Sequence, residues 1–505
     1  MPMDSNQAAP AAGAWSGRGA RWLLALVFAA GLALRLVGLS QPPYDSHGFR
    51  QTQTLGTIEI FHAEGIDLLH PKTIYMGWPG TFVLELPVFQ ATAAALYGVF
   101  GAHIEIVRLV NIACGFGAAW LLFRLVARLL NRAVAGWAVV VFWLAPLNIL
   151  YQRSMLLDPM AVCFALLACE RLAALLVPDE AGRKNSTWSC FAVFALATLV
   201  TALIKALYLW PAVLLVAQQF FARRGKLDAP LVRVGVVFAL AGAAFVAWNL
   251  YAIHINDASP FTRNVKPTTL LGISAWFSPE FYWTLLMRRP KWWLGLPGVL
   301  LYPAGLWVVW RQRNAAAWLL VLIPPTYLLA FANVNLPHDY YQLIITPFLA
   351  VVPALALDRW CGRRTNFAWA AGLVGIGAAA FMYLAWKHQP QVEPELLRLE
   401  RLCAGKLSPG KSAMVFVGQE KCGGRIDSYI PEFIYAARQR GYGRSVADAN
   451  GGARYFRALA GAFPHLDYVI CFGTESPGWL PKERFEPLVT DAAEQLYIFQ
   501  RREKP

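Results

Sequence analysis

The sequence predicts a polytopic α-helical membrane protein of about eleven transmembrane helices, with a small α/β domain at its C-terminal end. Two observations carry this prediction. The chain of 505 residues is 57% hydrophobic and only 15% charged, which is more apolar than an ordinary soluble protein. Its apolar residues gather into runs of about 20, the length that a helix needs to cross a bilayer while satisfying its own backbone hydrogen bonds.

Basic residues separate these apolar runs. A net charge of +15 would suit a nucleic-acid-binding protein if it formed one surface, but here Lys and Arg occur in short clusters between apolar segments. This pattern is typical of membrane topology, so we expect the membrane as a partner and no nucleic acid. The tail 1–21 precedes an apolar run that lacks a convincing cleavage site, and that run is predicted to be a retained first helix.

Charge decides which of twelve apolar runs cross the membrane. If all of them crossed, the basic cluster at 124–132 and every later basic loop would lie outside, against the positive-inside rule. The run at 82–100 is the weakest, because Glu85 and Pro87 interrupt its start. If this run lies along the outer surface instead, eleven runs cross the membrane and the basic clusters fall inside. The eleven predicted crossings are 22–39, 105–123, 134–150, 157–177, 188–204, 206–222, 230–252, 293–310, 315–333, 341–357 and 366–386.

This topology divides the chain into three parts. They are a cytoplasmic tail (1–21), a transmembrane domain (22–386) that includes a long outer loop (40–104), and a C-terminal domain (387–505) on the outer side. In a Gram-negative bacterium the outer side is the periplasm. We therefore expect a multi-pass inner-membrane protein whose active site and C-terminal domain face the periplasm.

The C-terminal segment is predicted to be a small α/β domain, since about 115 residues can form a core of their own. Strand-like runs alternate with helical stretches, the strands at 413–417, 468–472 and 496–499 and the helices at 431–440 and 453–462. Cys403 and Cys422 are candidates for a disulfide in an oxidising compartment, with Cys471 left over.

Titratable and aromatic residues gather at the predicted outer ends of the helices. Taken singly, each has a structural explanation: a helix cap for Asp45 or Asp158, a snorkelling side chain for Lys205, and a satisfied loop histidine for His338. Ionisable residues at membrane depth are costly, and a common location favours a shared site. The set comprises Asp45, His47, Arg50, Gln51, Glu85, Asp158, Lys205, His338, Tyr340 and Tyr341.

These motifs resemble the GT-C superfamily of membrane glycosyltransferases, and within it glycosyltransferase family 39, which includes the protein O-mannosyltransferases and the aminoarabinose transferase that acts on lipid A. The resemblance covers most of residues 22–360. It rests on Asp45 with the following His47-Gly48-Phe49-Arg50-Gln51-Thr52, Glu85-x-Pro87, Arg108, Tyr151-x-Arg153 with Asp158-Pro159, Thr201 to Lys205, and His338-Asp339-Tyr340-Tyr341. The best-known members carry Asp-Glu where this chain has Asp45-Ser46, which leaves the acceptor open.

The resemblance implies transfer of a sugar, with inversion, from a polyprenyl-phosphate donor in the outer leaflet to a hydroxyl of a lipid, glycan or protein acceptor. The leaving phosphate needs positive charge or a metal rather than a general acid, and Lys205, Arg50 and Arg108 are the candidates. The acceptor hydroxyl needs a base, for which Asp45 is the first candidate and His47 the second.

The remaining residues are expected to bind substrate. Glu85, Asp158 and His338 are candidates to orient sugar hydroxyls or to hold a divalent metal, whose presence is left uncommitted. Gln51 follows Arg50 in the first motif, and Tyr340 and Tyr341 could stack on sugar or line a lipid groove. An interfacial aromatic belt is the alternative role for the aromatic residues.

Two other functions compete with a transferase. A transporter or flippase would be expected to show inverted repeats and charges at the membrane midplane, and neither is clear here. A polyprenyl-linked-glycan polymerase or ligase would be expected to carry its key loop late in the chain. In this sequence the acidic motif at Asp45 directly follows the first helix instead.

Overall fold

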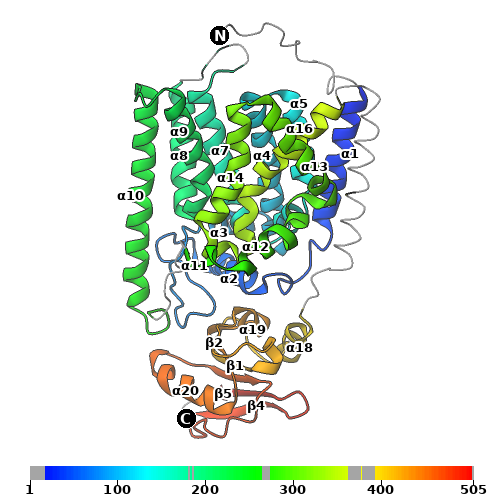
Figure 1. Ribbon diagram of the computed structural model, residues 1–505. Helices are drawn as coiled ribbons and strands as arrows, with labels where there is room; N and C mark the ends of the chain where they lie inside the picture. Colours follow the sequence, from blue (N-terminus) through cyan, green and yellow to red (C-terminus); the bar gives the residue numbers. More distant parts are fainter. Residues whose placement is uncertain are drawn as a thin grey trace, which may run out of the picture.

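The computed structural model describes residues 18–179, 182, 184, 187–263, 273–361, 377 and 393–502. A body of packed helices carries a small sheet unit at one end (Figure 1). The predicted crossing at 366–386, apart from Gly377, lies outside the described residues. So do most of the predicted N-terminal tail and the predicted boundary at 387.

Helices stand at ten of the eleven predicted crossings. They are α1 (Arg18–Leu36), α4 (Ile104–Leu129), α5 (Arg132–Leu144) with α6 (Pro146–Gln152), α7 (Asp158–Leu176), α8 (Trp188–Lys205), α9 (Trp210–Ala222), α10 (Ala229–Asp257), α13 (Pro290–Gln312), α14 (Ala315–Ala330) and α16 (Thr346–Cys361). By length and composition, six described helical stretches could cross a membrane, or seven if α5 and α6, bent by 61°, form one span. The chain is a multi-pass membrane protein, as its composition predicts.

The stretch that contains α8 and α9 reverses direction at Lys205. The backbone there leaves the helical region (φ −154°, ψ 79°), and a short 3-10 turn, η1 (Ala206–Leu209), follows. Cys190 near the start of α8 and Arg223 just after α9 both contact backbone oxygens in the C-terminal turns of α7, at 3.9 and 3.3 Å. Lys205 instead pairs with Asp158 at the start of α7. The two helices are therefore antiparallel, and Lys205 lies at the tip of their hairpin.

Two shorter helices lie at the end of the body that faces the sheet unit (Figure 1). They are α2 (Gly48–Glu64) and α3 (Val88–Phe100). With 13 residues, α3 is one of the shorter apolar helices and is not among the described stretches long enough to cross a bilayer by themselves. The helical body also contains, among the described residues, the segments α11 (Ile273–Trp276), α12 (Pro279–Trp283), η2 (Thr284–Arg288), α15 (Ala332–Asn335) and η3 (Asp339–Ile345).

The C-terminal unit is a five-stranded mixed sheet of order β2-β1-β3-β5-β4. Its strands are β1 (Ser412–Gly418), β2 (Arg440–Val446), β3 (Tyr468–Phe472), β4 (Phe485–Asp491) and β5 (Leu496–Arg501), and its helices are α18 (Pro394–Cys403), α19 (Pro431–Ala436) and α20 (Ala449–Leu459). β1 pairs in parallel with β2 and β3, and β5 pairs antiparallel with β3 and β4. The three predicted strands are present. The sequence missed β2 and β4, and the predicted helix at 431–440 ends early at α19.

The suggested disulfide is wrong. Cys403 and Cys422 are both buried and both free. The Cys422 thiol instead donates to the backbone oxygen of Gly418 at 3.3 Å, which fixes it in the turn after β1.

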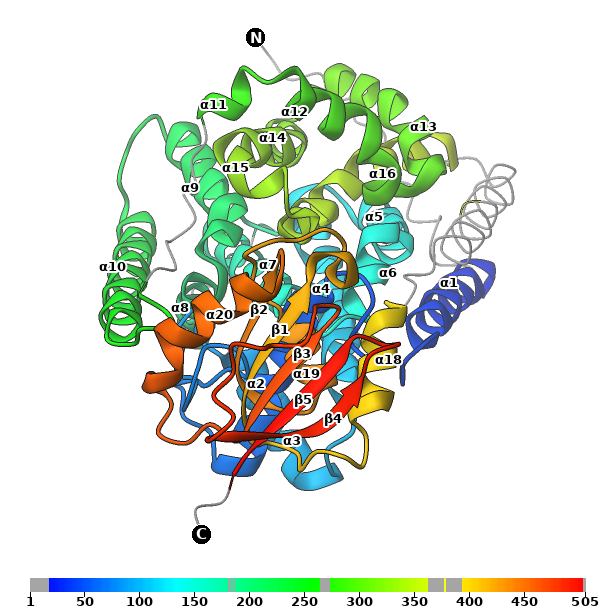
Figure 2. The ribbon, with the colours of Figure 1, turned by 90° about the horizontal axis from the view of Figure 1, so that it is seen from below.

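The sheet unit docks on α2 and on the loop that follows it. The amide of Gly77 donates to the Gly441 oxygen at 2.7 Å, and the amide of Gly441 donates to Ile74 at 2.8 Å, so this loop extends the edge of β2. Tyr435 of α19 donates to Glu59 of α2 at 2.6 Å. Seen from below, the sheet lies across α2, with α1 and α10 to either side (Figure 2). The outer loop thereby joins the helical body to the C-terminal unit.

The topology is testable at the two ends of α4. A reporter fused after Gly101 is expected to behave as external and one fused after Arg132 as cytoplasmic, because only this assignment puts the basic clusters inside. A fusion after Lys226, in the loop that follows α9, serves as a cytoplasmic control. A cytoplasmic Gly101 fusion would overturn the surface placement of α3.

Candidate functional site

The predicted site residues come from helix ends on the side of the body that faces the sheet unit. Asp45 and His47 lie in the turn before α2, and Arg50 and Gln51 lie in its first turn. Asp158 stands in the first turn of α7, where Pro159 favours helix initiation and a negative charge suits the helix dipole. Elements far apart in the sequence therefore place their polar side chains in one region.

The structure excludes the simple capping and snorkelling roles. The cap residue of α2 is His47, that of α7 is Leu157, and neither helix has a side-chain cap hydrogen bond. Lys205 does not reach out to solvent, because its side chain is only 3% exposed. Asp45, Asp158 and Lys205 thus need another explanation for their position.

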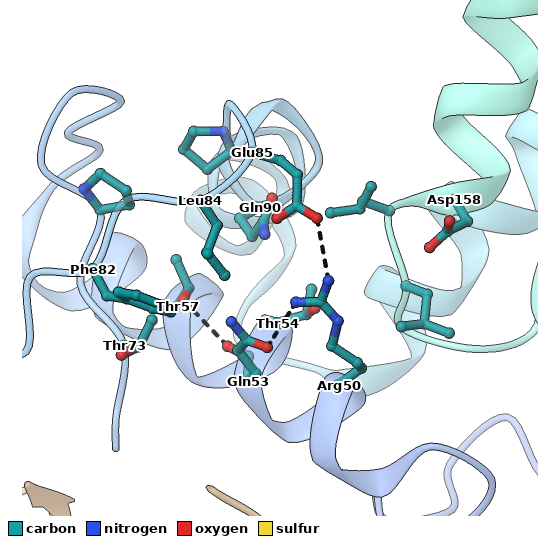
Figure 3. A pocket seen from close by; sticks show the side chains of 14 residues that line it. Arg50, Gln53, Thr54, Thr57, Thr73, Phe82, Leu84, Glu85, Gln90 and Asp158 are labelled. Carbon is teal, nitrogen blue, oxygen red and sulfur yellow. Dashed lines mark hydrogen bonds and ion pairs between the residues drawn. The ribbon is translucent and has the colours of Figure 1, made fainter. Parts of the chain in front are cut away.

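Arg50, Glu85, Asp158 and Lys205 form one ion-pair cluster, here called the Lys205 cluster. Lys205 Nζ lies 3.3 Å from Asp158 Oδ1 and 4.0 Å from Glu85 Oε1, and Arg50 Nη2 lies 3.2 Å from the same Glu85 oxygen. Figure 3 shows Arg50 pointing toward Glu85, with Asp158 on the neighbouring helix. These three residues line a crevice of about 30 Å³, room for roughly one water molecule. The cluster joins α2, the outer loop, α7 and the α8–α9 hairpin.

Lys205 has ion-pair neighbours but unused hydrogen-bonding capacity. Its Nζ is buried and has no hydrogen-bond partner of good geometry among the described residues. The ammonium also lies 3.8 Å from the ring centre of Tyr341 and 5.1 Å from that of Tyr340, which are favourable cation–π distances. Tyr208 donates to Asp158 Oδ1 at 2.8 Å and holds that carboxylate in place. Lys205 therefore keeps unused N–H groups although two carboxylates lie within ion-pair distance of it.

The charge state of the cluster follows from its pairing. Burial by itself would raise the pKa of the Glu85 carboxyl, but the charges of Arg50 and Lys205 together lower that pKa below its ordinary value. Burial likewise opposes the charge on Arg50, yet Glu85 keeps the pKa of Arg50 well above its usual range. Glu85 and Arg50 are thus both ionised at neutral pH.

Asp45 belongs to a second set of contacts. Its carboxylate accepts a hydrogen bond from Gln51 Nε2 and lies 3.7 Å from Arg153 Nη2. Gln51 in turn accepts from the amide of Met155 at 3.2 Å. Arg108 donates to backbone oxygens just after α1, at Gly38 and Leu39, so its contacts anchor that helix end rather than the Lys205 cluster.

His47 is held by partners that the sequence analysis did not assign. Its Nε2 lies 3.0 Å from Asp339 Oδ1 and 2.7 Å from the Tyr151 hydroxyl, while Arg289 donates to Asp339 Oδ2 at 2.6 Å. An ionised carboxylate only accepts, so the tautomer with its proton on Nε2 suits the contact with Asp339, and in that tautomer Nδ1 can accept a proton. His47 also adopts a left-handed backbone (φ 59°), which is uncommon for a residue other than glycine.

Signals for two of these partners were present in the sequence. Asp339 and Tyr151 both belong to the quoted motifs, and the acidic residue beside His338 could have been assigned with them. The role of Arg289 could not be predicted from the sequence. It stands beside two other basic residues, Arg288 and Lys291, a pattern that is typical of a solvated loop.

The predicted metal candidates are not gathered into one site. His338 stacks on Tyr340, with ring centres 5.2 Å apart, and burial together with the nearby cations lowers its pKa below the ordinary value. Among the described residues, no three His, Cys, Asp or Glu side chains come together as a metal-binding group. Glu85 and Asp158 are already paired with the Lys205 ammonium, so the residues in this arrangement do not fit a divalent metal.

The helical body with its C-terminal sheet defines a polytopic membrane protein of the GT-C fold. No family model matches the chain, and no curated protein matches it. Among solved structures it is similar to ArnT from Cupriavidus metallidurans in the apo state, with a TM-score of 0.65 and 15% identity over 95% of this chain and 98% of that one.

Two further solved structures share the fold. The same ArnT bound to undecaprenyl phosphate has a TM-score of 0.63 and 14% identity over 95% of this chain and 98% of that one. The archaeal oligosaccharyltransferase AglB from Archaeoglobus fulgidus, in complex with an inhibitory peptide and a dolichol-phosphate, has a TM-score of 0.58 and 11% identity over 90% of this chain and 69% of that one. At these identities the similarity establishes the fold alone.

Proposed function

We propose that the protein is a glycosyltransferase, similar to glycosyltransferase family 39, that moves a sugar from a polyprenyl-phosphate donor to an acceptor hydroxyl with inversion. The reaction takes place at the outer face of the bacterial inner membrane. The observation that carries the proposal is the buried Lys205 ammonium at the tip of a transmembrane hairpin, whose N–H groups have no hydrogen-bond partner in the part of the chain that the structure describes. Two solved structures of the same fold contain a polyprenyl-type phosphate, which supports this assignment.

The proposed reaction divides the work between the two sets of residues. The acceptor oxygen forms a bond to the anomeric carbon as the bond from that carbon to the phosphate oxygen breaks. The phosphate leaves with the electron pair and is stabilised by Lys205 and Arg50, so no general acid is required. Asp45 takes the proton from the acceptor hydroxyl. Glu85 and Asp158 orient the cations and can accept hydrogen bonds from the sugar.

A transfer assay tests this function. Purified protein in detergent, given polyprenyl-phosphate sugars with a radiolabelled sugar and a mixture of envelope lipids, glycans and proteins, is expected to move label onto an acceptor and to release polyprenyl phosphate in equal amount. Protein reconstituted in vesicles serves as the comparison. Movement of intact donor across the vesicle membrane, with no covalent product, would establish a transporter instead. A ladder of repeating products would indicate a polymerase.

A further inference from the structure

A second cavity, of about 410 Å³, lies between the turn before α2 and the C-terminal unit. Its volume falls within the range of about 300–1,000 Å³ that is typical of small-molecule sites. Residues 44–49 line one side, and Glu393, Leu396, Arg425 and Glu432 line the other. We propose that this cavity binds the acceptor, and that it takes an uncharged or amine-bearing saccharide rather than a phosphorylated or otherwise anionic group.

The position of the cavity assigns it to the acceptor. This cavity and the crevice of the Lys205 cluster share no lining residue and meet at the start of α2. Residues 44–49 line the cavity, whereas Arg50 and later residues of α2 line the crevice. Asp45 and His47, the two candidate bases, both belong to this cavity. A hydroxyl bound here can therefore reach a base while the donor phosphate lies at Lys205. This step rests on the proposed transferase function.

An unpartnered buried carboxylate lines this cavity. The Glu432 side chain is only 4% exposed, and its Oε2 has no hydrogen-bond partner among the described residues. Arg425 forms an ion pair with the other oxygen of Glu432 and donates to the Cys422 carbonyl at 3.0 Å. A buried acceptor without a partner is costly, and the hydroxyl or amino group of a ligand would satisfy it.

The charges around the cavity select against anions. Three carboxylates line it, Asp45, Glu393 and Glu432, whereas its guanidinium, Arg425, is already bound to one of them. Asp45 is paired with Arg153 outside the lining, but a phosphate would still meet more carboxylates than cations in the cavity wall, whereas saccharide hydroxyls donate to carboxylates, and Ser46 can exchange hydrogen bonds with them. Phe49 offers apolar surface to the C–H face of a sugar ring. The C-terminal unit thus supplies half of the acceptor site.

The test compares Glu432→Gln with Glu395→Gln. Glu395 lies on α18 in the same unit and is ion-paired with Lys421 at 3.3 Å, but it does not line the cavity. The two full-length variants and the wild type, in detergent, are applied to an array of neutral, amino and phosphorylated saccharides. We expect wild-type binding to be confined to neutral and amino saccharides. Glu432→Gln is expected to weaken it roughly tenfold or more, through loss of charge-assisted hydrogen bonds, and Glu395→Gln to leave it unchanged.

Three outcomes would overturn the acceptor assignment: binding to phosphorylated saccharides, equal effects of the two variants, or no binding to any saccharide. Unfolding temperature, measured on each variant, separates lost binding from lost structure, and Glu393→Gln at the rim of the cavity provides a second variant. Binding of polyprenyl phosphate is measured on the same preparations. Its absence would count against the proposed transferase, whereas its presence without saccharide binding would count against the acceptor site alone.

Discussion

Replacing Asp45 by asparagine is expected to lower sugar transfer by roughly a hundredfold or more, the typical contribution of a general base. The substitution removes the charge but keeps the shape and one oxygen, so the hydrogen bond from Gln51 survives. Asp45 also lies outside the Lys205 cluster, and donor binding is expected to remain close to that of the wild type. The measurements are initial transfer rates at saturating donor, polyprenyl-phosphate affinity and unfolding temperature.

The comparison with His47 decides which residue is the base. If Asp45→Asn retained near-normal turnover while His47→Ala lost it, the base would be His47, and Asp45 would be a structural link between Gln51 and Arg153. In that case Asp339→Asn would also be impaired, because Asp339 fixes the ring of His47. If Asp45 is the base, Asp339→Asn is expected to lower the rate of sugar transfer much less than Asp45→Asn does.

Replacing Lys205 by alanine is expected to abolish detectable use of the donor, and Lys205→Arg is expected to retain part of it. The reason is that a buried positive charge at the leaving phosphate matters more than the geometry of a single contact. The alanine variant also leaves Asp158 buried without its cation, which typically costs about 3–5 kcal/mol of stability. Donor affinity and unfolding temperature must therefore be measured together.

A matched control exists farther along α7. Glu170 is 1% exposed and pairs with Arg124 at 2.8 Å and with Arg171 at 2.5 Å, so the double variant Arg124→Ala/Arg171→Ala also removes the cations from a buried carboxylate. This variant is expected to lose stability but to keep its affinity for polyprenyl phosphate. If Lys205→Ala bound polyprenyl phosphate as tightly as the wild type, the Lys205 cluster would be a structural ion-pair network, and the donor phosphate would bind elsewhere.

The sequence by itself determined the class of protein, the positions of the described helices at ten predicted crossings and the gathering of polar residues at one end, but not α2, α11, α12, α15 or α18. These features are local. Hydropathy over about 20 residues decides whether a segment can cross a bilayer, and the sign of the flanking charges decides its direction. Lys205 could be placed in a turn from its position between two apolar runs, and Asp45 from its position directly after the first helix.

Only the tertiary structure decided which side chains meet. His47 and Asp339 are 292 residues apart, and nothing in either segment specifies the other as its partner. The same holds for Glu432, which reaches the turn before α2 only because the edge of β2 docks on the outer loop at Ile74 and Gly77. Partner choice depends on which helix ends pack together, and that is a property of the whole fold. Hydropathy and flanking charge together give the span and direction of each helix but not its neighbours.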